Sequence, residues 1–367
     1  MQFDDHTRSV LDANGFDGVP FEELRRSFVA GEIDEETCRL EGAVDLPGAG
    51  FTDTVPHIGA KRWRHFAQVG AREIAAGRVG VVILNGGMAT RFGGIVKGTV
   101  EVLGGRSFLD LKINQVVSSS GGKASVFLMN SFATDRPTKQ HLEKIGFGDE
   151  ITCFNQFVSV RIEPDGNILK DADGKPSLYA PGHGDFPYAL ARSKVLDRFI
   201  AGGGRWLTLS NVDNLGAGLD PAVIGMHVEL QRPMSVELVE TFPRDVGGFP
   251  AIHGGRMSII EAFRLPSAFD LDTIPYINTN TFVFDAEALV RPPQLDWFVT
   301  RKMAEGRPAI QFERLVGQLS EHLEVSWLKV PRKGRWSRFL PVKVPSDLAE
   351  CRDLIEEVVK AQSEVRP

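Results

Sequence analysis

The clearest hydrophobic pattern in the chain is a continuous apolar run, VGVVIL at residues 79–84, which leads into a glycine-rich segment from Asn85 to Lys97. A short run rich in β-branched residues is typical of a strand buried on both faces. Upstream, residues 55–77 have the spacing of an amphipathic helix that ends at Gly77. The pattern therefore predicts a helix, a buried strand and a glycine-rich loop in succession.

The alternation continues downstream. Ser107 and Asp110 resemble a capping box and predict a helix over residues 108–119. The next segments read as strands at 123–130, 150–156 and 205–214 and as helices at 134–146 and 185–204. This order indicates an α/β fold with a doubly wound, mainly parallel sheet. Ligands of such sheets lie beyond the carboxyl ends of the strands, where the polar segments fall.

After Ser235 the pattern becomes more antiparallel. It predicts strands at 235–241, 248–253, 257–266, 276–285 and 324–330, a hairpin turn at 253–256, and helices at 313–323 and 346–362. We therefore expect a helical N-terminal segment (1–78), a main domain (79–347) with an inserted antiparallel subdomain at about 235–330, and a C-terminal helix (348–367).

The formal net charge of −6 argues against general binding to nucleic acid or anionic membranes, although a few local cations can still hold a polyanionic ligand. Cys38, Cys153 and Cys351 are too widely spaced for a disulfide framework or a CxxC metal pair. The polar N-terminus does not resemble a signal peptide, and no apolar run reaches the length of a membrane span. We expect a cytoplasmic protein with reduced thiols.

The segment LNGGMATRFGGIVKG, residues 84–98, has the composition of a phosphate-binding loop, with Arg91 and Lys97 adding positive charge. It matches neither a P-loop, because Gly98 follows Lys97, nor a GxGxxG dinucleotide motif. The alternative is a glycine-rich connector with solvated charges.

Other polar segments are candidates of the same kind. In SNVDN, Asp213 could hold a hard divalent cation that bridges phosphates, or it could form an Asx turn. In PGHGD, the glycines around His183 would let a ligand come close, while Asp185 is a candidate helix N-cap. Asn278 and Asn280 are unusual in a strand and suggest a hydroxyl-rich partner, although a polar strand face is the alternative.

Two further residues are ambiguous when taken alone. Glu261 is either a solvated strand residue or a hydrogen-bond acceptor for sugar hydroxyls, and Lys343 at the end of RFLPVK is either a surface lysine or a ligand contact.

Eight segments occur in the following order along the chain: LNGGMATRFGGIVKG, SFLDL, FLMNSF, FNQ, PGHGD, SNVDNLGA, NTN and LPVK. Together they resemble the eukaryotic-type UTP–glucose-1-phosphate uridylyltransferases, also called UDP-glucose pyrophosphorylases. The resemblance runs from about Val79 to Asp347. It implies a Rossmann-like nucleotide-diphospho-sugar transferase fold. It also implies that UTP and glucose 1-phosphate are converted to UDP-glucose and pyrophosphate, with Mg²⁺ as cofactor and hexose 1-phosphate as the second substrate.

The resemblance also implies roles for individual residues. Lys97 would contact the phosphates, Arg91 the departing pyrophosphate, Asp213 the Mg²⁺ ion, and Lys343 the phosphates of both substrates. UTP would be bound by Leu84, Asn85, Gly86, Gly87, Gln156, Gly182 and Asn211, and His183 would contact substrate. The sugar would be lined by Gly248, Glu261, Asn278 and Asn280, and Thr279 would be a further substrate-binding residue.

The sequence departs from the family pattern in three places. Ala89 stands where the family usually has Gly, and Ile95-Val96 replaces the usual residues before the lysine. After Lys343 the sequence predicts only a helix. We therefore expect the β-helix of many family members to be missing, and we expect a monomer or small homo-oligomer.

Two alternatives to glucose uridylyl transfer remain. One is the same chemistry on N-acetylglucosamine 1-phosphate, although SNVDNLGA and FLMNSF favour the glucose branch. The other is a homologue that binds nucleotide sugar without turnover, against which the intact Lys97, Asp213 and Lys343 argue.

Overall fold

The computed structural model describes residues 3–89, 94–243 and 245–364. Its centre is an eight-stranded sheet with the strand order β2-β19-β13-β16-β12-β3-β8-β9. These strands are β2 (Asp53–Thr54), β3 (Val79–Leu84), β8 (Ser125–Asn130), β9 (Thr152–Asn155), β12 (Trp206–Asn211), β13 (Met234–Glu240), β16 (Tyr276–Asp285) and β19 (Val325–Lys329). β16 runs antiparallel to both β12 and β13, whereas the other neighbours pair in parallel. The predicted mainly parallel α/β fold is thus confirmed.

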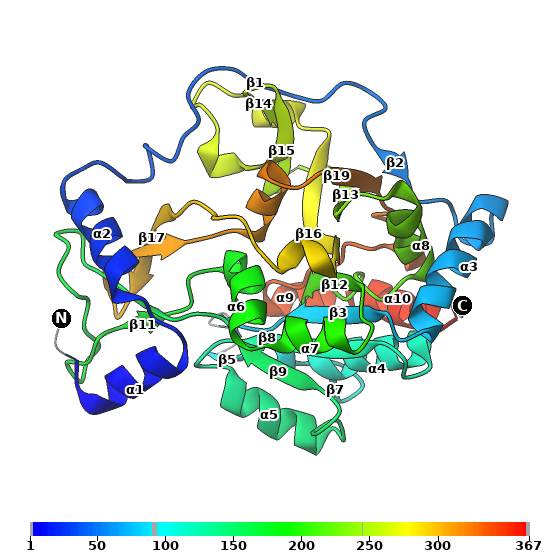
Figure 1. Cartoon of the computed structure of the whole chain (residues 1–367), viewed down its shortest axis with the longest axis horizontal. Coiled ribbons are helices and arrows are strands. Elements are labelled where there is room, and N and C mark those ends of the chain that lie inside the picture. The colour runs from blue at the N-terminus through cyan, green and yellow to red at the C-terminus, as the bar shows by residue number, and fades with distance from the viewer. Residues whose placement is uncertain (1–2, 90–93, 244, 365–367) are drawn as a thin grey trace.

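Helices cover both faces of this sheet (Figure 1). They are α3 (Lys61–Ala75), α4 (Phe108–Ser120), α5 (Asp135–Lys144), α6 (Phe186–Arg192), α7 (Val195–Ala201), α8 (Pro221–Leu230), α9 (Pro345–Glu350) and α10 (Arg352–Glu364). Within β3, Val81 and Ile83 pack into the core formed with α3, α4, α8 and α10, while Val82 and Leu84 pack into the core formed with α6 and α7. The uninterrupted apolar run of β3 therefore reflects burial on both faces.

The predicted strands at 79–84, 123–130, 150–156 and 205–214 are all present, and Ser107 caps α4 by accepting a hydrogen bond from the Asp110 amide. The helix predicted at 185–204 is wrong in one respect, because Lys194 has a φ of 59° and separates α6 from α7. The helix predicted at 313–323 is a 3₁₀ helix over Val316–Glu321, and the C-terminal helix is divided into α9 and α10.

Residues 235–330 contribute to three sheets, one of them a two-stranded hairpin at residues 298–313. β13, β16 and β19 belong to the central sheet, whereas β14 (Gly248–His253) and β15 (Arg256–Glu261) form the predicted hairpin and pair with β1 (Val44–Asp45) in a separate sheet. The remaining short strands are β4 (Met88–Ala89), β5 (Ile95–Val96), β6 (Glu101–Leu103), β7 (Arg106–Ser107), β10 (Ser159–Val160), β11 (Leu178–Tyr179), β17 (Phe298–Ala304) and β18 (Arg307–Glu313).

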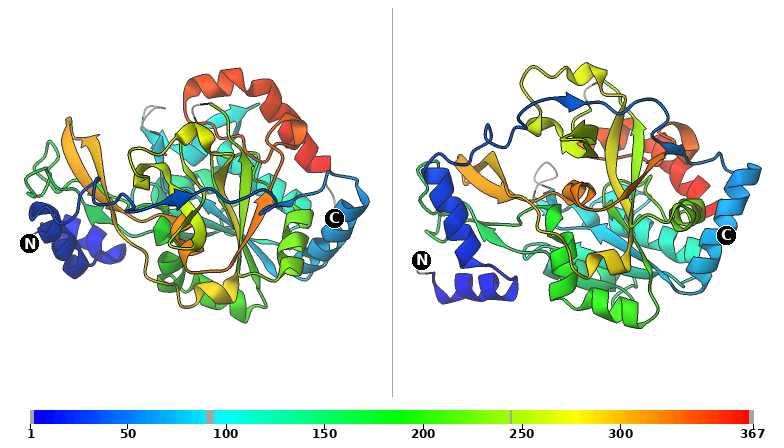
Figure 2. Two further views of the ribbon diagram at one scale, coloured as in Figure 1. Left: turned by 90° about the horizontal axis from the view of Figure 1, so that it is seen from above. Right: turned by 45° about the horizontal axis from the view of Figure 1, so that its top comes forward.

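The N-terminal helices α1 (Asp5–Ala13) and α2 (Gly18–Val29) lie beside β11 and β17, far from α3 (Figure 1). Leu11, Phe21 and Phe28 form a small core with Ile310 and Phe312 of β18. The connection from α2 to α3 crosses the molecule, as both views of Figure 2 show, and contributes β1 and β2 on the way. Among the described residues, none of the helices is both long and apolar enough to cross a bilayer.

Candidate active site

A cavity of about 420 Å³ lies at the carboxyl edge of the parallel strands. It is lined by Leu84, Gly86, Gly87, Lys97, Met129, Gln156, Ala180, Gly182, His183, Asn211, Val212, Asp213, Lys302 and Glu313. These residues lie at or just after the carboxyl ends of β3, β8, β9 and β12, directly after β5, on β17 and β18, or in the loop before α6. The fold therefore brings together side chains from segments far apart in the sequence.

At one end of the cavity, which we call the phosphate end, the Lys97 ammonium lies 2.5 Å from the Asp213 carboxylate. Both side chains are largely buried, at 18% and 16% exposure, so their charges interact more strongly than they would in bulk water. The Asp213 carbonyl accepts a hydrogen bond from the Val342 amide, 3.1 Å away. This contact brings the backbone of Lys343 next to Asp213, while the Lys343 side chain is exposed.

Lys112 of α4 supports this end from behind. Its buried ammonium lies 2.9–3.3 Å from the Ser210 hydroxyl and from the carbonyl oxygens of Asn211, Asn214 and Ala217. Burial lowers the pKa of Lys112 to about 7, and the nearby negative charge of Asp213 opposes this shift. Lys112 thus fixes the loop that carries Asp213 from within the core.

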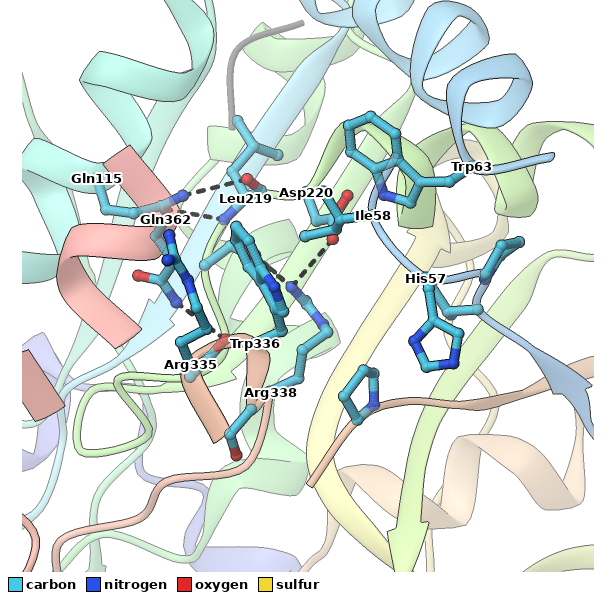
Figure 3. A pocket seen from close by; sticks show the side chains of 16 residues that line it. His57, Ile58, Trp63, Gln115, Leu219, Asp220, Arg335, Trp336, Arg338 and Gln362 are labelled. Carbon is cyan, nitrogen blue, oxygen red and sulfur yellow. Dashed lines mark hydrogen bonds and ion pairs between the residues drawn. The ribbon is translucent and has the colours of Figure 1, made fainter. Parts of the chain in front are cut away.

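Arg338 is the second support of the phosphate end. Its guanidinium is buried, forms hydrogen bonds of 2.7 and 2.5 Å with the Glu237 carboxylate, and donates to the Gly218 carbonyl. The cavity behind it has a volume of only about 60 Å³ and is surrounded by Trp63, Trp336 and Arg338 (Figure 3). Arg338 therefore ties the segment before Lys343 to β13 and to the loop before α8.

At the other end, which we call the base end, two loops meet. Gln156 follows β9 and packs against Gly86, where a Cβ atom would lie 2.2 Å from the Gln156 amide nitrogen. Gly182 has a φ of 95°, and a Cβ there would lie 2.5 Å from the Arg314 carbonyl. Gly182 therefore requires glycine, whereas a side chain at residue 86 would force the Gln156 amide to move.

His183 has a defined protonation state. Its Nδ1 accepts a hydrogen bond of 3.0 Å from the Val316 amide. Burial lowers the pKa of His183 to about 4, against the opposing effect of Glu313. The imidazole is therefore neutral near pH 7, and because Nδ1 is an acceptor, the proton is on Nε2.

Asn280 connects the cavity to β16. Its side-chain amide donates to Asn211 Oδ1 at 2.9 Å, and its own backbone amide donates to Asn278 Oδ1. The pairing of β13 with β16 shifts at this point, and Asn280 has a φ of 55°. Asparagine tolerates this conformation better than most residues, and such strain is frequently found at functional sites.

Other predicted residues lie outside the cavity lining. Gly248 pairs with Glu261 in the β14–β15 hairpin, and a Cβ on Gly248 would lie 2.7 Å from Glu261 Oε1. Burial raises the pKa of Glu261 to about 7, while Arg264 lowers it. Thr279 faces the opposite side of β16 from Asn280 and donates to the Glu237 carbonyl.

The family model for UTP–glucose-1-phosphate uridylyltransferase matches residues 53–361, which is most of the chain. The chain belongs to this family. It is 32% identical over 295 residues to UTP–glucose-1-phosphate uridylyltransferase 2 of Dictyostelium discoideum, a match that covers 74% of this chain and 58% of that protein. The chain thus spans about three fifths of the length of such relatives.

Solved structures show the same fold. The chain is similar to the UDP-N-acetylglucosamine pyrophosphorylase of Trypanosoma brucei in complex with an inhibitor, with a TM-score of 0.75 at 18% identity, over 94% of this chain and 79% of that one. It is also similar to an S374W mutant of Leishmania major UDP-glucose pyrophosphorylase in complex with UDP-glucose, with a TM-score of 0.70 at 21% identity, over 94% and 76% of the two chains.

Many of the residues singled out from the family resemblance meet in the cavity. Those that line it are Leu84, Gly86, Gly87, Lys97, Gln156, Gly182, His183, Asn211 and Asp213. Asn85 lies beneath it, because its side-chain amide is buried and donates to Asn130 and Thr138. Arg91 lies outside the described residues. Asp185 does not use its side chain as a helix cap, but pairs with Arg314.

Sequence reasoning missed four residues at or behind the site: Lys302, Glu313, Lys112 and Arg314. Lys302 and Glu313 form an ion pair on the β17–β18 hairpin, which the hydrophobic pattern did not predict. Lys112 carried a usable signal, because a lysine in the apolar stretch FLDLKINQVV requires buried acceptors.

Proposed function

We propose that this chain is a uridylyltransferase that joins UMP from UTP to glucose 1-phosphate and releases pyrophosphate. One observation carries the proposal. Nine residues with nucleotide, phosphate or metal roles implied by the family resemblance line a single cavity, with a lysine–carboxylate pair at one end. The reaction needs no protein nucleophile, because an oxygen of the sugar phosphate attacks the α-phosphorus of UTP in line and pyrophosphate leaves.

Catalysis of this kind depends on positioning and on neutralising phosphate charge. Lys97 and Lys343 would bind phosphate oxygens, and the rigid layer formed by Lys112 and Arg338 would keep their loops in place. Gln156 and Gly182 would contact the uracil. The neutral His183, with its proton on Nε2, would donate a hydrogen bond to an oxygen of the nucleotide.

The residues present fit a magnesium ion that is held together with substrate. Mg²⁺ in phosphate-transfer sites commonly takes one or two carboxylates plus phosphate oxygens. Among the described residues, no three His, Cys, Asp or Glu side chains are grouped so that they could hold a metal ion by themselves. Phosphate oxygens of the substrate would therefore supply the other ligands. Asp213, partly buried in the cavity, would hold the ion, which when bound would neutralise phosphate charge.

The residues that would bind the sugar lie on β14, β15 and β16. Glu261, Asn278 and Asn280 can accept from and donate to several hydroxyls, which favours glucose 1-phosphate. The acetamide of N-acetylglucosamine 1-phosphate would displace some of these partners and weaken binding. Cytoplasmic location and a monomer or small homo-oligomer stay predictions.

A coupled assay of pyrophosphate release tests the proposal. It would use purified protein with UTP and Mg²⁺, and compare glucose 1-phosphate with N-acetylglucosamine 1-phosphate. We expect turnover with glucose 1-phosphate and a kcat/KM at least tenfold lower with the N-acetyl sugar. Equal or better use of the N-acetyl sugar would make the alternative activity correct, and UTP binding without turnover of either sugar would indicate a non-catalytic homologue.

A further inference from the structure

The N-terminal segment contacts the loop that carries Gln156. Ala13, Asn14 and Gly15 join α1 to α2, and this turn lies against the end of β9 and the end of α6 (Figure 1). The turn precedes the region matched by the family model, which begins at residue 53, so the family match gives it no role. Its contacts surround the residue that would read the base.

Asn14 connects the turn to the residue next to Gln156. Asn14 is buried, with 6% of its surface exposed, and its Oδ1 accepts a hydrogen bond of 3.1 Å from the Asn155 side-chain amide. Its own side-chain nitrogen donates to the Val10 carbonyl of α1 at 2.9 Å. Because both ends of the Asn14 amide are bonded, its side chain is held in one orientation and Asn155 is fastened to α1.

Arg192, the last residue of α6, contacts the same loop on both sides of Gln156. Its Nη1 donates to the Ala13 carbonyl at 3.0 Å and its Nη2 donates to the Asn155 carbonyl at 3.2 Å. The guanidinium carbon also lies 5.1 Å from the ring centre of Phe157. A planar guanidinium can make these contacts at the same time, so one side chain joins the residues before and after Gln156 to the N-terminal turn.

The turn comes so close to this loop that it leaves no room for a further side chain. Gly15 has a φ of 68°, and a Cβ atom there would lie 3.0 Å from both Arg192 Cδ and Phe157 Cε1. The loop is also bonded to the central sheet, because the Gln156 backbone amide donates to the Asn130 carbonyl at 2.9 Å. Gln156 is therefore held both by the sheet and by the N-terminal turn.

The chemistry of Gln156 makes this support important. A glutamine side chain carries a donor and an acceptor, so one orientation matches the edge of uracil and the flipped orientation matches the edge of cytosine. A side chain discriminates between these bases only if it is fixed in one orientation, which depends on where its backbone is held. Resting on the proposed function, we propose that Asn14 and Arg192 are positioning residues that fix Gln156 for uracil, so that the N-terminal segment takes part in nucleotide selection.

Calorimetric titration of the full chain with UTP and with CTP, each with Mg²⁺, tests this selection. Asn14→Leu removes the acceptor for Asn155, and Arg192→Met removes the hydrogen bonds to the turn and to the loop. Arg192 is an exposed residue, so its substitution should leave the chain folded. The native chain should prefer UTP, and each variant should lower this preference about threefold or more, as expected for a lost hydrogen bond. A native chain without preference, or an unchanged preference in both variants, overturns the proposal.

Arg25→Met is the matched control. Arg25 of α2 holds the same N-terminal segment to a different loop, because its Nε donates to the Gly166 carbonyl at 2.5 Å, and that loop does not line the candidate active site. We expect Arg25→Met to lower the melting temperature as Arg192→Met does, and to keep the native preference for UTP. An equal loss of preference in Arg25→Met would show a general effect of loosening the segment and would contradict the assignment.

Hydrogen–deuterium exchange without nucleotide separates this inference from the proposed function. Asn14→Leu and Arg192→Met should speed the exchange of the Gln156 and Phe157 backbone amides, which are bonded in the native chain, and Arg25→Met should not. Unchanged exchange at both amides contradicts the positioning role. Faster exchange in a chain that does not bind UTP refutes the proposed function and leaves the support of Gln156 by the N-terminal segment standing.

Discussion

The two ends of the candidate active site are both supported by buried cations, but in different ways. Behind the phosphate end, Lys112 lies near four oxygen acceptors, Arg338 is paired with Glu237, and a cavity of only about 60 Å³ remains. Behind the base end, Arg314 pairs with one carboxylate and leaves a buried Nε beside a cavity of about 400 Å³. The end where phosphates would react is therefore packed more tightly than the end where the base would bind.

This difference agrees with the role that we propose for each end. Displacement at phosphorus needs groups held within a fraction of an ångström, so mobility there is costly. Recognition of a base tolerates small adjustments better than the chemical step does.

The largest effect is expected on stability at the phosphate end. Arg338→Met should lower the free energy of unfolding by about 3–5 kcal/mol, because it leaves the buried Glu237 carboxylate without its partner. Arg314→Met should lower the free energy of unfolding by less. Burial already raises the pKa of Asp185, so this carboxyl can take up a proton when its partner is removed, and the larger cavity admits water. Urea unfolding at pH 7 measures both, and equal losses would show that the two supports do not differ.

Next is the effect of Lys97→Ala on turnover. We expect a roughly hundredfold lower kcat, typical for loss of a group that stabilises phosphate charge, with a small change in the KM for UTP. Lys123→Ala, at an exposed position, is the matched control and should behave as the native chain. A loss that appears mainly in KM would mean that Lys97 serves binding rather than chemistry.

A smaller, pH-dependent effect is expected from Glu261. Its folded-state pKa, about 7, lies above the ordinary glutamate value of 4.5, so the native state binds more protons than the unfolded state between these two values. Its contribution to stability is therefore complete below about pH 4.5 and is lost as the pH rises toward 7. Across this pH window, the free energy of unfolding of the native chain should fall by about 1–2 kcal/mol relative to that of Glu261→Gln, as measured by urea unfolding. This is less than the whole change in pKa would give, because the Glu261 side chain keeps some contact with solvent. A constant difference between the two proteins would contradict the raised pKa.

The smallest effect concerns Asn280. Asn280→Ala should destabilise the chain by about 1 kcal/mol more than Asn280→Gly, because alanine does not tolerate the positive φ. Both variants lose the hydrogen bond to Asn211 and should lower kcat/KM for the sugar phosphate by a similar small factor. Thermal unfolding gives the first comparison and the pyrophosphate assay the second. Equal stability of the two variants would show that the backbone conformation at this position is not strained.

The sequence predicted those parts of the site that depend on local order. Gly86, Gln156 and Asp213 each follow a strand with a clear apolar pattern, and parallel pairing brings the ends of such strands together. Lys112, Arg314 and Arg338 could not be assigned in this way, because their partners lie about 100 or more residues away in the sequence. The break at Lys194 was missed because lysine does not signal a positive φ.

The crossing segment between α2 and α3 has a consequence for biosynthesis. β1 pairs with β14, and β2 pairs with β19 at the far edge of the central sheet, so both N-terminal strands must wait until more than 200 further residues have been made. At about 5–20 residues per second, this delay is on the order of 10–60 s on the ribosome. During that time the strands have no partner edge, so this segment can close over the domain only after the strands that it pairs with have been made.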